Sequence, residues 1–510
     1  MIKNLKWLLL VSLTFVACND DEETVVISNS SDGLPLTAGT ANFSKYVSLG
    51  NSLTAGFADN ALFIQGQKDS YTNILSEQFK LVGGGDFKIP FMSDNVGGLL
   101  LGGNIIQGTR LYFNGTAPTP VTGPPTTDVS TVLTGGFNNM GVPGAKSFHL
   151  LSNTYGNPAG IGTYANPYFV RFASATSATI VGDAVTQNPT FFSLWIGNND
   201  VLSYATSGGT GTNQLGNLNP ATYGGNDITN PNVFASVYNT IVTNMTAGGA
   251  KGVLANIPYV TSVPFFTTVP TNPIPLDAAT AAQLNGGLLG PVDAILTALG
   301  QPDRLVVLTA SSTNPLLIKD ESLVNYSAQI TGALIANNVP AAQAGLMGNL
   351  YGQARHASNA TASKDYILLN ARGVIGTTQA GVPAPFNKVG VTFPMADGTT
   401  LTASETAEVK TATDAYNISI QAIATSKGLA FVNANAVLNQ VANGGVSGNG
   451  YNITSVYVTG GGFSLDGVHP SPRGYGLIAN KFLEAINLTY GSNFKGVSFA
   501  NYRILYPASL

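Results

Sequence analysis

The sequence predicts an α/β fold, a three-layer sandwich in which helices cover both faces of a five-stranded parallel sheet. Short apolar runs rich in β-branched and aromatic residues alternate along the chain with segments of helical periodicity. Polar residues and glycines directly follow several of these runs, and parallel sheets bind ligands at the carboxyl ends of their strands. The predicted strands are Tyr46–Leu49, Asn138–Val142, Phe191–Ile196, Gly252–Ile257 and Leu429–Val432.

The helices are predicted from apolar residues that recur every three or four positions. The clearest case follows the third strand, where Phe234, Tyr238 and Ile241 share one stripe and Gly248-Gly249 ends the pattern. The last helix is expected to begin at Ser471-Pro472, which suit an N-cap and a first turn. The other core helices are expected at Ser70–Phe79, Ala145–Leu151 and Ala407–Lys427, and the last one is expected to end near Leu488.

Long segments without core periodicity interrupt this pattern. We expect one domain over residues 44–510, with insertions at about 83–136, 205–232 and 258–400. The third insertion is far longer than a strand-to-helix connection needs, which predicts a cap or a subdomain. Within it the sequence indicates helices at 278–299 and 323–336, and strand-like pieces at 305–308 and 366–369.

The composition excludes several classes of protein. Charged residues make up only 9% of the chain, against roughly 25% in typical soluble domains. The formal net charge is −4 and no basic run is present, so we expect no nucleic acid partner. No group of His, Cys, Asp and Glu has the spacing of metal ligands, so we expect neither a metal nor another cofactor. We expect a monomer.

The amino terminus has the pattern of a secretory signal. Lys3 and Lys6 precede an apolar run that is too short for a stable transmembrane helix and ends at Cys18, the only cysteine. The end of the run resembles a bacterial lipobox, which implies a signal peptide over 1–17, lipidation of Cys18 and a tether over 18–43. We therefore expect an outer membrane lipoprotein that faces the periplasm or the cell surface. The alternative is a plain signal peptide with an ordinary cysteine.

Two distant segments carry the residues of a serine nucleophile and its base. Ser52 lies in the break after the first strand, and a serine hydroxyl needs a base to become a nucleophile. His469 is preceded by Asp466 in Asp-Gly-Val-His, where a turn could let the carboxylate hold one ring nitrogen while the other faces Ser52. The alternatives are a turn serine, a surface histidine and a capping aspartate.

Four short blocks, taken together, resemble the SGNH (GDSL) hydrolase family. They occur in the family's order and are Gly50-Asn51-Ser52-Leu53, Asn139-Met140-Gly141-Val142-Pro143-Gly144, Gly197-Asn198-Asn199-Asp200 and Asp466-Gly467-Val468-His469. The resemblance implies a flavodoxin-like fold and a triad of Ser52, His469 and Asp466. It also implies an oxyanion hole made by the N–H groups of Ser52 and Gly144 and the amide of Asn199. The usual aspartate before the serine is Asn51 here, which is not a member of the triad.

An aromatic run after the fourth strand could line an acyl pocket. Its candidate residues are Tyr259, Phe265 and Phe266, and the alternative is that they pack the insertion against the core. Of the two other histidines, we interpret His149 as a structural helix residue, and His356 has no visible partner.

The sequence therefore predicts a serine ester hydrolase that forms an acyl-enzyme on Ser52 and is attached to a membrane through Cys18. The expected substrates are carboxylic esters with lipid-like or short acyl groups. A carbohydrate O-acetyl esterase is the close alternative, because the uncharged polar loops could contact a glycan. A non-catalytic surface lipoprotein that binds glycan or lipid is the alternative from another class.

Overall fold

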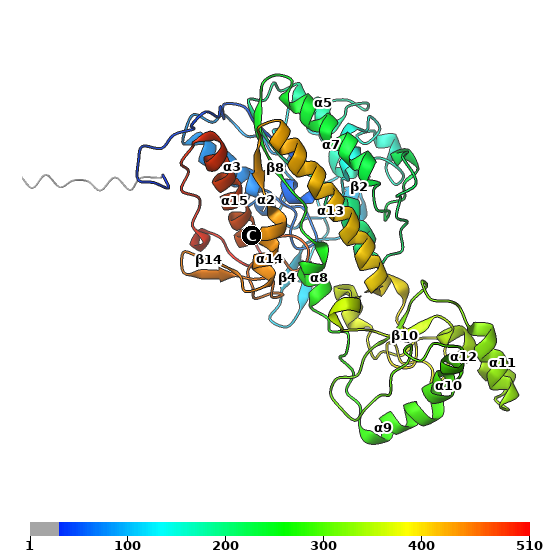
Figure 1. The fold of residues 1–510 in the computed structure, drawn as a ribbon. Helices are drawn as coiled ribbons and strands as arrows, with labels where there is room; N and C mark the ends of the chain where they lie inside the picture. The colour runs from blue at the N-terminus through cyan, green and yellow to red at the C-terminus, as the bar shows by residue number, and fades with distance from the viewer. Residues whose placement is uncertain (1–29) are drawn as a thin grey trace, which may run out of the picture.

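A five-stranded sheet with all strands parallel forms the centre of the protein (Figure 1). The computed structural model describes residues 30–510, so the predicted signal peptide and Cys18 lie outside the described residues. The strand order β13-β8-β7-β1-β6 is doubly wound, with its switch point between β1 and β7. The prediction of an α/β fold with a five-stranded parallel sheet is confirmed. The strands are β1 (Tyr46–Gly50), β6 (Asn139–Gly141), β7 (Phe191–Trp195), β8 (Lys251–Ala255) and β13 (Ala430–Val432).

Helices cover both faces of this sheet, which gives three layers (Figure 1). In β7, Phe192 and Leu194 point into one core, whereas Phe191 and Trp195 point into the other. Both faces of the strand are apolar because both are covered, as parallel sheets require. The first core is closed by α5 (Ile180–Val185), α7 (Pro231–Thr246) and α13 (Ala403–Ser426), and the second by α3 (Tyr71–Lys80) and α15 (Pro472–Tyr490).

Side-chain caps set where the long helices begin. The Ser471 hydroxyl accepts a hydrogen bond from the N–H of Gly474, and Pro472 occupies the first turn of α15. Thr402 and Glu405 form a capping box that starts α13 four residues before the predicted start at Ala407. The apolar stripe alone therefore placed the beginning of this helix too late.

Shorter elements fill the connections between the core elements. The helices among them are α1 (Ser52–Ala55), α2 (Ile64–Lys68), α4 (Pro167–Val170), α6 (Asn199–Thr206), α8 (Pro264–Thr267) and α14 (Ala434–Ala442). The antiparallel hairpins pair β2 (Leu99–Leu101) with β3 (Asn104–Gln107), β4 (Leu111–Phe113) with β5 (Pro118–Pro120), and β14 (Val446–Gly448) with β15 (Tyr451–Ile453).

The chain between β8 and α13 forms a lobe beside the sheet (Figure 1). It has two hydrophobic cores of its own, one centred on Val292, Leu296 and Tyr351 and the other on Leu316, Ile318 and Ile367. Its elements are α9 (Ala278–Gln283), a π-helix (Leu284–Leu289), α10 (Gly290–Ala298), β9 (Leu317–Lys319), α11 (Ser327–Ala336), α12 (Ala341–Tyr351), β10 (Ala354–His356), β11 (Tyr366–Ile367) and β12 (Thr400–Leu401).

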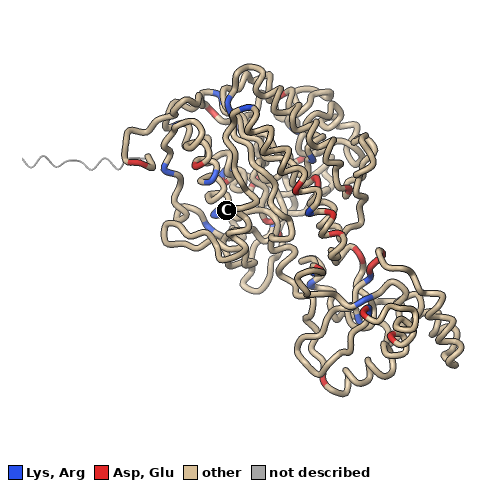
Figure 2. The backbone as a smooth tube through the Cα atoms, viewed as in Figure 1, with Lys and Arg blue, Asp and Glu red and all other residues tan. Residues whose placement is uncertain are grey.

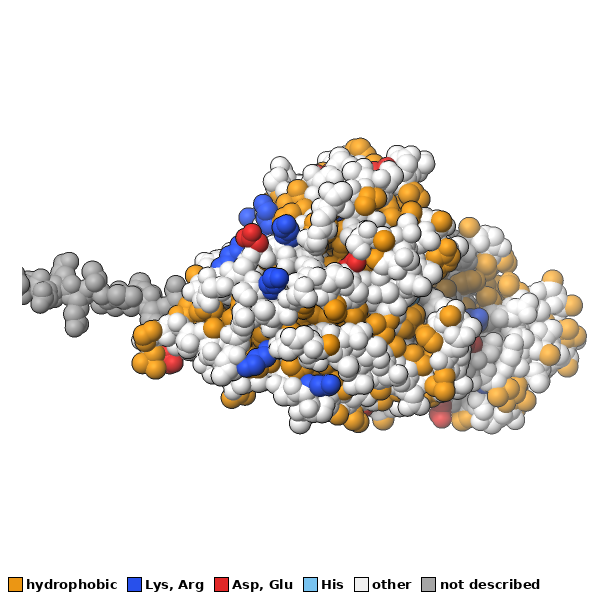
Figure 3. All heavy atoms as spheres, turned by 90° about the horizontal axis from the view of Figure 1, so that it is seen from above, with side chains coloured by type: hydrophobic (Ala, Val, Ile, Leu, Met, Phe, Trp, Pro, Cys, Tyr) orange, Lys and Arg blue, Asp and Glu red, His pale blue; other side chains and the backbone are white. Residues whose placement is uncertain are grey.

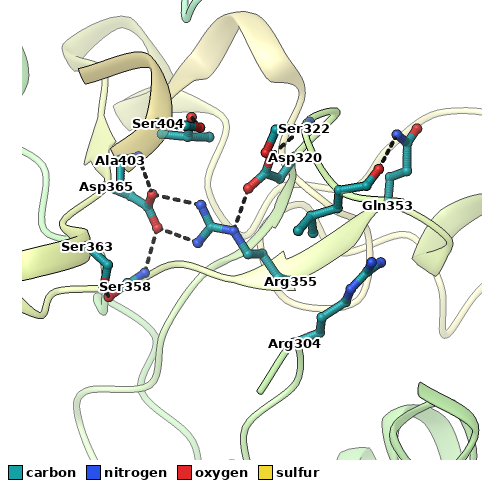
Figure 4. Close-up of polar contacts among 12 residues, drawn as sticks. Arg304, Asp320, Ser322, Gln353, Arg355, Ser358, Ser363, Asp365, Ala403 and Ser404 are labelled. Atoms are coloured by element: carbon teal, nitrogen blue, oxygen red, sulfur yellow. Dashed lines mark hydrogen bonds and ion pairs between the residues drawn. The ribbon is translucent and has the colours of Figure 1, made fainter. Parts of the chain in front are cut away.

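A buried ion-pair network joins this lobe to the first turn of α13 (Figure 4). The Arg355 guanidinium makes two bonds to Asp365, at 2.6 and 2.8 Å, and one to Asp320 at 2.6 Å. Asp365 also accepts a hydrogen bond from the N–H of Ala403 at 3.0 Å. The Asp365 carboxylate is fully buried, so its charge depends on Arg355 for compensation.

Several predicted boundaries inside the insertion and its surroundings are wrong. Residues 305–308 do not form a strand, because side chains accept the hydrogen bonds of their N–H groups: His356 Nδ1 bonds Val306, and Asn285 Oδ1 bonds Leu308. The helix expected at 145–151 is a 3₁₀-helix, Ser147–Leu151. Helix α11 begins at Ser327 rather than at 323, and β11 ends at Ile367.

The predicted tether extends too far into the domain. Residues 30–43 were assigned to it, but Ser31 donates its N–H to Asn493 at 2.8 Å, and Thr37 donates to the Asn493 side chain. The Phe43 ring is buried and stacks on Phe79 at 4.1 Å between centroids. These residues pack against the carboxyl-terminal end of α15, so they belong to the domain.

Few charges are present at the surface. Figure 2 shows Lys, Arg, Asp and Glu scattered sparsely along the chain, and Figure 3 shows a face on which uncharged and apolar side chains dominate. Across residues 30–510, none of the helices is both long and apolar enough to cross a membrane.

Candidate active site

Ser52 is placed by the end of β1 and the start of α1. Asn51 caps this short helix by accepting the N–H of Leu53 at 3.0 Å. Gly50 has no room for a side chain, because a Cβ there would lie 2.5 Å from the Trp195 carbonyl oxygen. The close packing of Gly50 therefore fixes the turn that carries Ser52 to the carboxyl edge of the sheet.

The structure brings Ser52, His469 and Asp466 into one hydrogen-bonded chain. The Ser52 Oγ lies 2.9 Å from His469 Nε2, although the two residues are 417 positions apart. The other ring nitrogen, Nδ1, lies 2.9 Å from Asp466 Oδ2. This arrangement lets Nδ1–H donate to the carboxylate while Nε2 accepts the serine proton, which is the geometry of a proton-relay triad.

The Asp466 carboxylate is held ionised by its surroundings. Its Oδ1 accepts the N–H groups of Val468 and His469, both at 2.8 Å, and its Oδ2 accepts the N–H of Asn60 at 3.0 Å. Burial by itself would raise the pKa of this carboxyl, but the interactions with His469 and these N–H groups lower it to about 2. The carboxylate therefore keeps its charge at neutral pH and fixes the His469 tautomer.

Glycine is required in the turn between Asp466 and His469. Gly467 has φ of +73°, a left-handed conformation that side chains rarely adopt. A Cβ there would also approach Leu369 Cδ2 at 3.0 Å and the Phe265 nitrogen at 3.1 Å. On the opposite side, the Phe57 ring lies 4.6 Å from the His469 ring, centroid to centroid.

Two of the three predicted oxyanion donors are backbone N–H groups, those of Ser52 and Gly144. Among the described residues, no protein group accepts a hydrogen bond from the N–H of Ser52 or Gly144. Gly144 has φ of +81°, and a Cβ there would contact only Asn166 Nδ2, at 3.8 Å. The Asn199 amide donates one hydrogen to the Ala145 carbonyl at 2.9 Å, which leaves its second hydrogen for a ligand.

Asp200 ties the second and third blocks together, as a positioning residue. Its carboxylate accepts the N–H and the hydroxyl of Ser147, at 2.8 and 2.7 Å. This contact holds the segment after Gly144 against the start of α6, where Asn199 lies. The side-chain nitrogens of Asn198 and Asn51 are buried beside them and have no hydrogen-bond partner.

A pocket opens from Ser52 and His469 across the carboxyl end of the sheet. It contains about 960 Å³ of space between protein atoms, part of it open to solvent. Its lining includes Trp195, Val432 and Phe482 together with residues of α14 and α15. The side chains beyond the catalytic end are almost all aliphatic or aromatic.

The three aromatics predicted to line such a pocket do not line this one, although Pro258, Val260 and Val263 of the same run do. Tyr259 donates its hydroxyl to Asp414, and Phe266 is buried in the core on the face of α7 and α13. The Phe265 N–H donates to the Gly467 carbonyl at 2.9 Å, so this residue supports the triad turn through its backbone. Their contacts favour the alternative interpretation, in which the run packs the insertion against the core.

Sequence reasoning missed Asp59 and Asn60, which hold the triad loop. The Asp59 Oδ1 accepts the N–H of Leu465 at 2.8 Å, and its own N–H donates to the Ser464 hydroxyl at 3.0 Å. Burial raises the pKa of the Asp59 carboxyl to about 7, and the nearby Asp466 charge contributes to the increase. Both residues have positive φ, and an Asp-Asn pair is a known signal for such a turn.

The other histidines have structural roles. The His149 ring stacks on Tyr155 at 4.3 Å and accepts the N–H of Lys146, and burial lowers the pKa of His149 to about 3. His356, which had no partner visible in the sequence, accepts the N–H of Val306, and burial lowers the pKa of His356 to about 4.

Three carboxylates that are far apart in the sequence converge at the junction of the lobe and α13. Oxygens of Glu321, Asp397 and Glu405 lie within 4.8 Å of one another. Burial, followed by the hydrogen bond and charge of Glu321, raises the pKa of Asp397.

Comparison of the chain with protein-family models, with curated proteins and with solved structures finds no match. The assignment of chemistry to this site therefore depends on its geometry.

Proposed function

We propose that this protein is a serine ester hydrolase, of the kind that its four sequence blocks resemble in the SGNH hydrolases. The observation that carries the proposal is the hydrogen-bonded chain from Ser52 through His469 to Asp466. The buried, ionised carboxylate and the unpaired backbone N–H groups of Ser52 and Gly144 support it.

In the first half-reaction, Ser52 Oγ attacks the carbonyl carbon of the ester while His469 Nε2 takes the serine proton. The carbonyl oxygen becomes an oxyanion, which the N–H groups of Ser52 and Gly144 and the Asn199 amide stabilise. His469 then gives its proton to the leaving alcohol as the C–O bond breaks, and the acyl group remains on Ser52. Asp466 stabilises the imidazolium that exists between the two proton transfers.

In the second half-reaction, His469 removes a proton from water, and the resulting hydroxide adds to the acyl carbon. The tetrahedral intermediate collapses, the bond to Ser52 Oγ breaks, and the serine recovers its proton from His469. The products are a carboxylic acid and an alcohol, with no need for a redox partner.

Covalent labelling with a fluorophosphonate probe tests the proposal. The wild-type protein should be labelled at Ser52 and should hydrolyse p-nitrophenyl acetate, whereas Ser52→Ala should do neither. Heat-unfolded protein is the control for non-specific labelling, because an unfolded serine lacks its base. A folded wild-type protein that neither reacts nor hydrolyses esters would instead support a binding protein.

We also propose that Cys18 anchors the protein to a membrane, as its lipobox-like position implies. Cys18→Ser should move the protein from the membrane fraction to the soluble fraction. A variant that stays in the membrane fraction would place the anchor elsewhere.

A further inference from the structure

We infer that the apolar pocket beside Ser52 is the subsite for the acyl chain of the ester, and that α14 and α15 limit its length to about that of an octanoyl group. The inference rests on the proposed hydrolase function and names the part of the substrate that determines selectivity. The candidate acyl-binding aromatics of the insertion have no part in it.

The pocket is continuous with the reacting atoms. Its lining begins with Ser52, Asn199 and His469 and continues without interruption along α14 and α15. A group bonded to the acyl carbon on Ser52 therefore has a direct path into this space. Such continuity with the nucleophile distinguishes a substrate subsite from an incidental surface depression.

The chemistry of the lining selects an aliphatic occupant. Val437, Leu438 and Val441 of α14 and Leu477 and Ile478 of α15 line the pocket, and Val441 and Leu477 belong to the same hydrophobic cluster. A sugar in this space would lose the water around its hydroxyl groups and gain no partners along these walls, which is costly. A hydrocarbon chain loses nothing and gains the transfer free energy of each buried methylene.

Polar groups lie only at the two ends of the pocket. The unpaired amide nitrogens of Asn51 and Asn198 lie at the catalytic end, where the ester oxygens would be. At the other end Lys481 is paired with Glu484 at 2.8 Å and is partly exposed to solvent. The acyl chain therefore has an apolar path that ends at a charged, hydrated rim.

The helices give the length of this path. The lining positions of α15 run from Gly474 to Phe482, and those of α14 from Ala434 to Val441. Seven to eight helical steps of ~1.5 Å span roughly 10–12 Å, which is the reach of roughly eight to ten carbons in an extended chain. Carbons beyond this length would pass the Lys481 rim into solvent and would add no further binding.

The test is the dependence of kcat/KM on chain length. With p-nitrophenyl esters from acetate to hexadecanoate, kcat/KM should rise about fourfold per methylene up to about the octanoate and then level off. Alkyl acetates of rising alcohol length should show no such rise, because the pocket is assigned to the acyl side. A rise with alcohol length, or acetate as the best substrate, would overturn the inference.

A blocking variant tests the assignment of the walls. Ile478 lines the pocket and is half-buried, so Ile478→Trp should fill the far half of the subsite while the helix tolerates the larger ring. The ratio of kcat/KM for octanoate to that for acetate should fall about 50-fold, the effect of about three methylene groups. The matched control is Leu488→Trp on the same helix, where the side chain is 89% exposed and away from the pocket.

Fluorophosphonate labelling of Ser52 distinguishes failure of the proposed acyl subsite from failure of the proposed hydrolase function. The subsite assignment is wrong, and the proposed hydrolase function is retained, if the wild-type protein is labelled but its kcat/KM does not vary with acyl chain length. The same conclusion follows if Ile478→Trp is labelled and keeps the wild-type ratio of kcat/KM for octanoate to acetate. If Ser52 in the folded protein is not labelled and no ester is cleaved, both the proposed function and the subsite fall.

Discussion

Replacing Asp466 with asparagine changes one oxygen of the carboxylate into an amide nitrogen and keeps the shape of the side chain. The new Oδ1 can still accept the N–H groups of Val468 and His469, as the native one does at 2.8 Å. The new Nδ2 takes the place of Oδ2, where it meets two donors, the N–H of Asn60 and the Nδ1–H of His469. The native tautomer of His469 is therefore no longer the favoured one.

The imidazole relieves this conflict by moving its proton to Nε2. Nδ1 then accepts from the amide, but Nε2 carries a hydrogen that faces the Ser52 hydroxyl and cannot accept the serine proton. The loss of the general base should lower kcat about 10⁴-fold. The free enzyme should also react with a fluorophosphonate far more slowly, because that reaction uses the same proton transfer.

The same substitution changes the stability in a pH-dependent way. The pKa of Asp466 lies at about 2 in the folded protein, against an ordinary value of 3.8. This difference corresponds to about 2.5 kcal/mol of folding stability at neutral pH. Because the folded pKa is the lower one, the contribution is present above pH ~4 and is lost as the pH falls through ~2. Asp466→Asn should therefore be less stable than wild type at pH 7, and the deficit should shrink toward pH 2.

Urea unfolding at pH 7 and pH 2.5, together with ester hydrolysis at pH 8, measures both effects. Ser52→Ala is the matched control, since it removes activity without removing the buried carboxylate. A folded Asp466→Asn protein with kcat within tenfold of wild type would refute the tautomer argument. A loss of stability that does not depend on pH would refute the claim that the ionised Asp466 carboxylate stabilises the fold.

Three further predictions concern the surroundings of the triad. Asn199→Ala should lower kcat about 10²–10³-fold with little change in KM, measured by steady-state hydrolysis; an unchanged kcat would remove Asn199 from the oxyanion hole. Asp59→Asn should raise the free energy of unfolding by about 2–4 kcal/mol at pH 8 and by little at pH 4. Because the pKa of Asp59 in the folded protein is raised from 3.8 to about 7, the wild-type fold loses stability as the pH rises from ~4 to ~7. Equal urea midpoints at pH 8 would contradict this. Arg355→Met should destabilise the lobe by about 3–5 kcal/mol by leaving Asp365 buried without its cation. The effect should be seen as faster proteolysis within the lobe, with Lys364→Met, at a partly exposed neighbouring lysine, as the control.

The strands and the two halves of the triad could be predicted because their signals are local. An apolar run that stops at Gly50 shows the end of a strand, and a cap such as Ser471 shows the start of a helix. In a parallel sheet, both of these points lie at the carboxyl edge. The fold class therefore predicts that Ser52 and His469 lie at the same edge of the sheet, whereas their 2.9 Å contact depends on the turn that carries His469.

The pocket could not be predicted with the same ease, because its lining comes from elements far apart in the sequence that meet only in the fold. Helix α14 did have a signal, since Ala434, Val437, Leu438 and Val441 follow the helical spacing, so this helix could be predicted. The role of Asp59 in holding the triad loop had no signal in the sequence, because the burial of a carboxyl depends on the loop that folds over it. In the same way, Leu305 and Leu308 are buried in a core without being part of a strand.

The insertion and the triad share a boundary, which gives the lobe a physical connection to catalysis. The chain leaves β8 and passes Phe265, whose N–H donates to the Gly467 carbonyl at 2.9 Å. Leu369, in a turn of the lobe itself, has a side chain that would lie 3.0 Å from a Cβ at position 467. The turn between Asp466 and His469 is thus packed against the segment that leaves the core for the lobe and against a turn of the lobe. A displacement of the base of the lobe must move this turn, and a shift of His469 by a fraction of an ångström is enough to weaken a 2.9 Å hydrogen bond to Ser52.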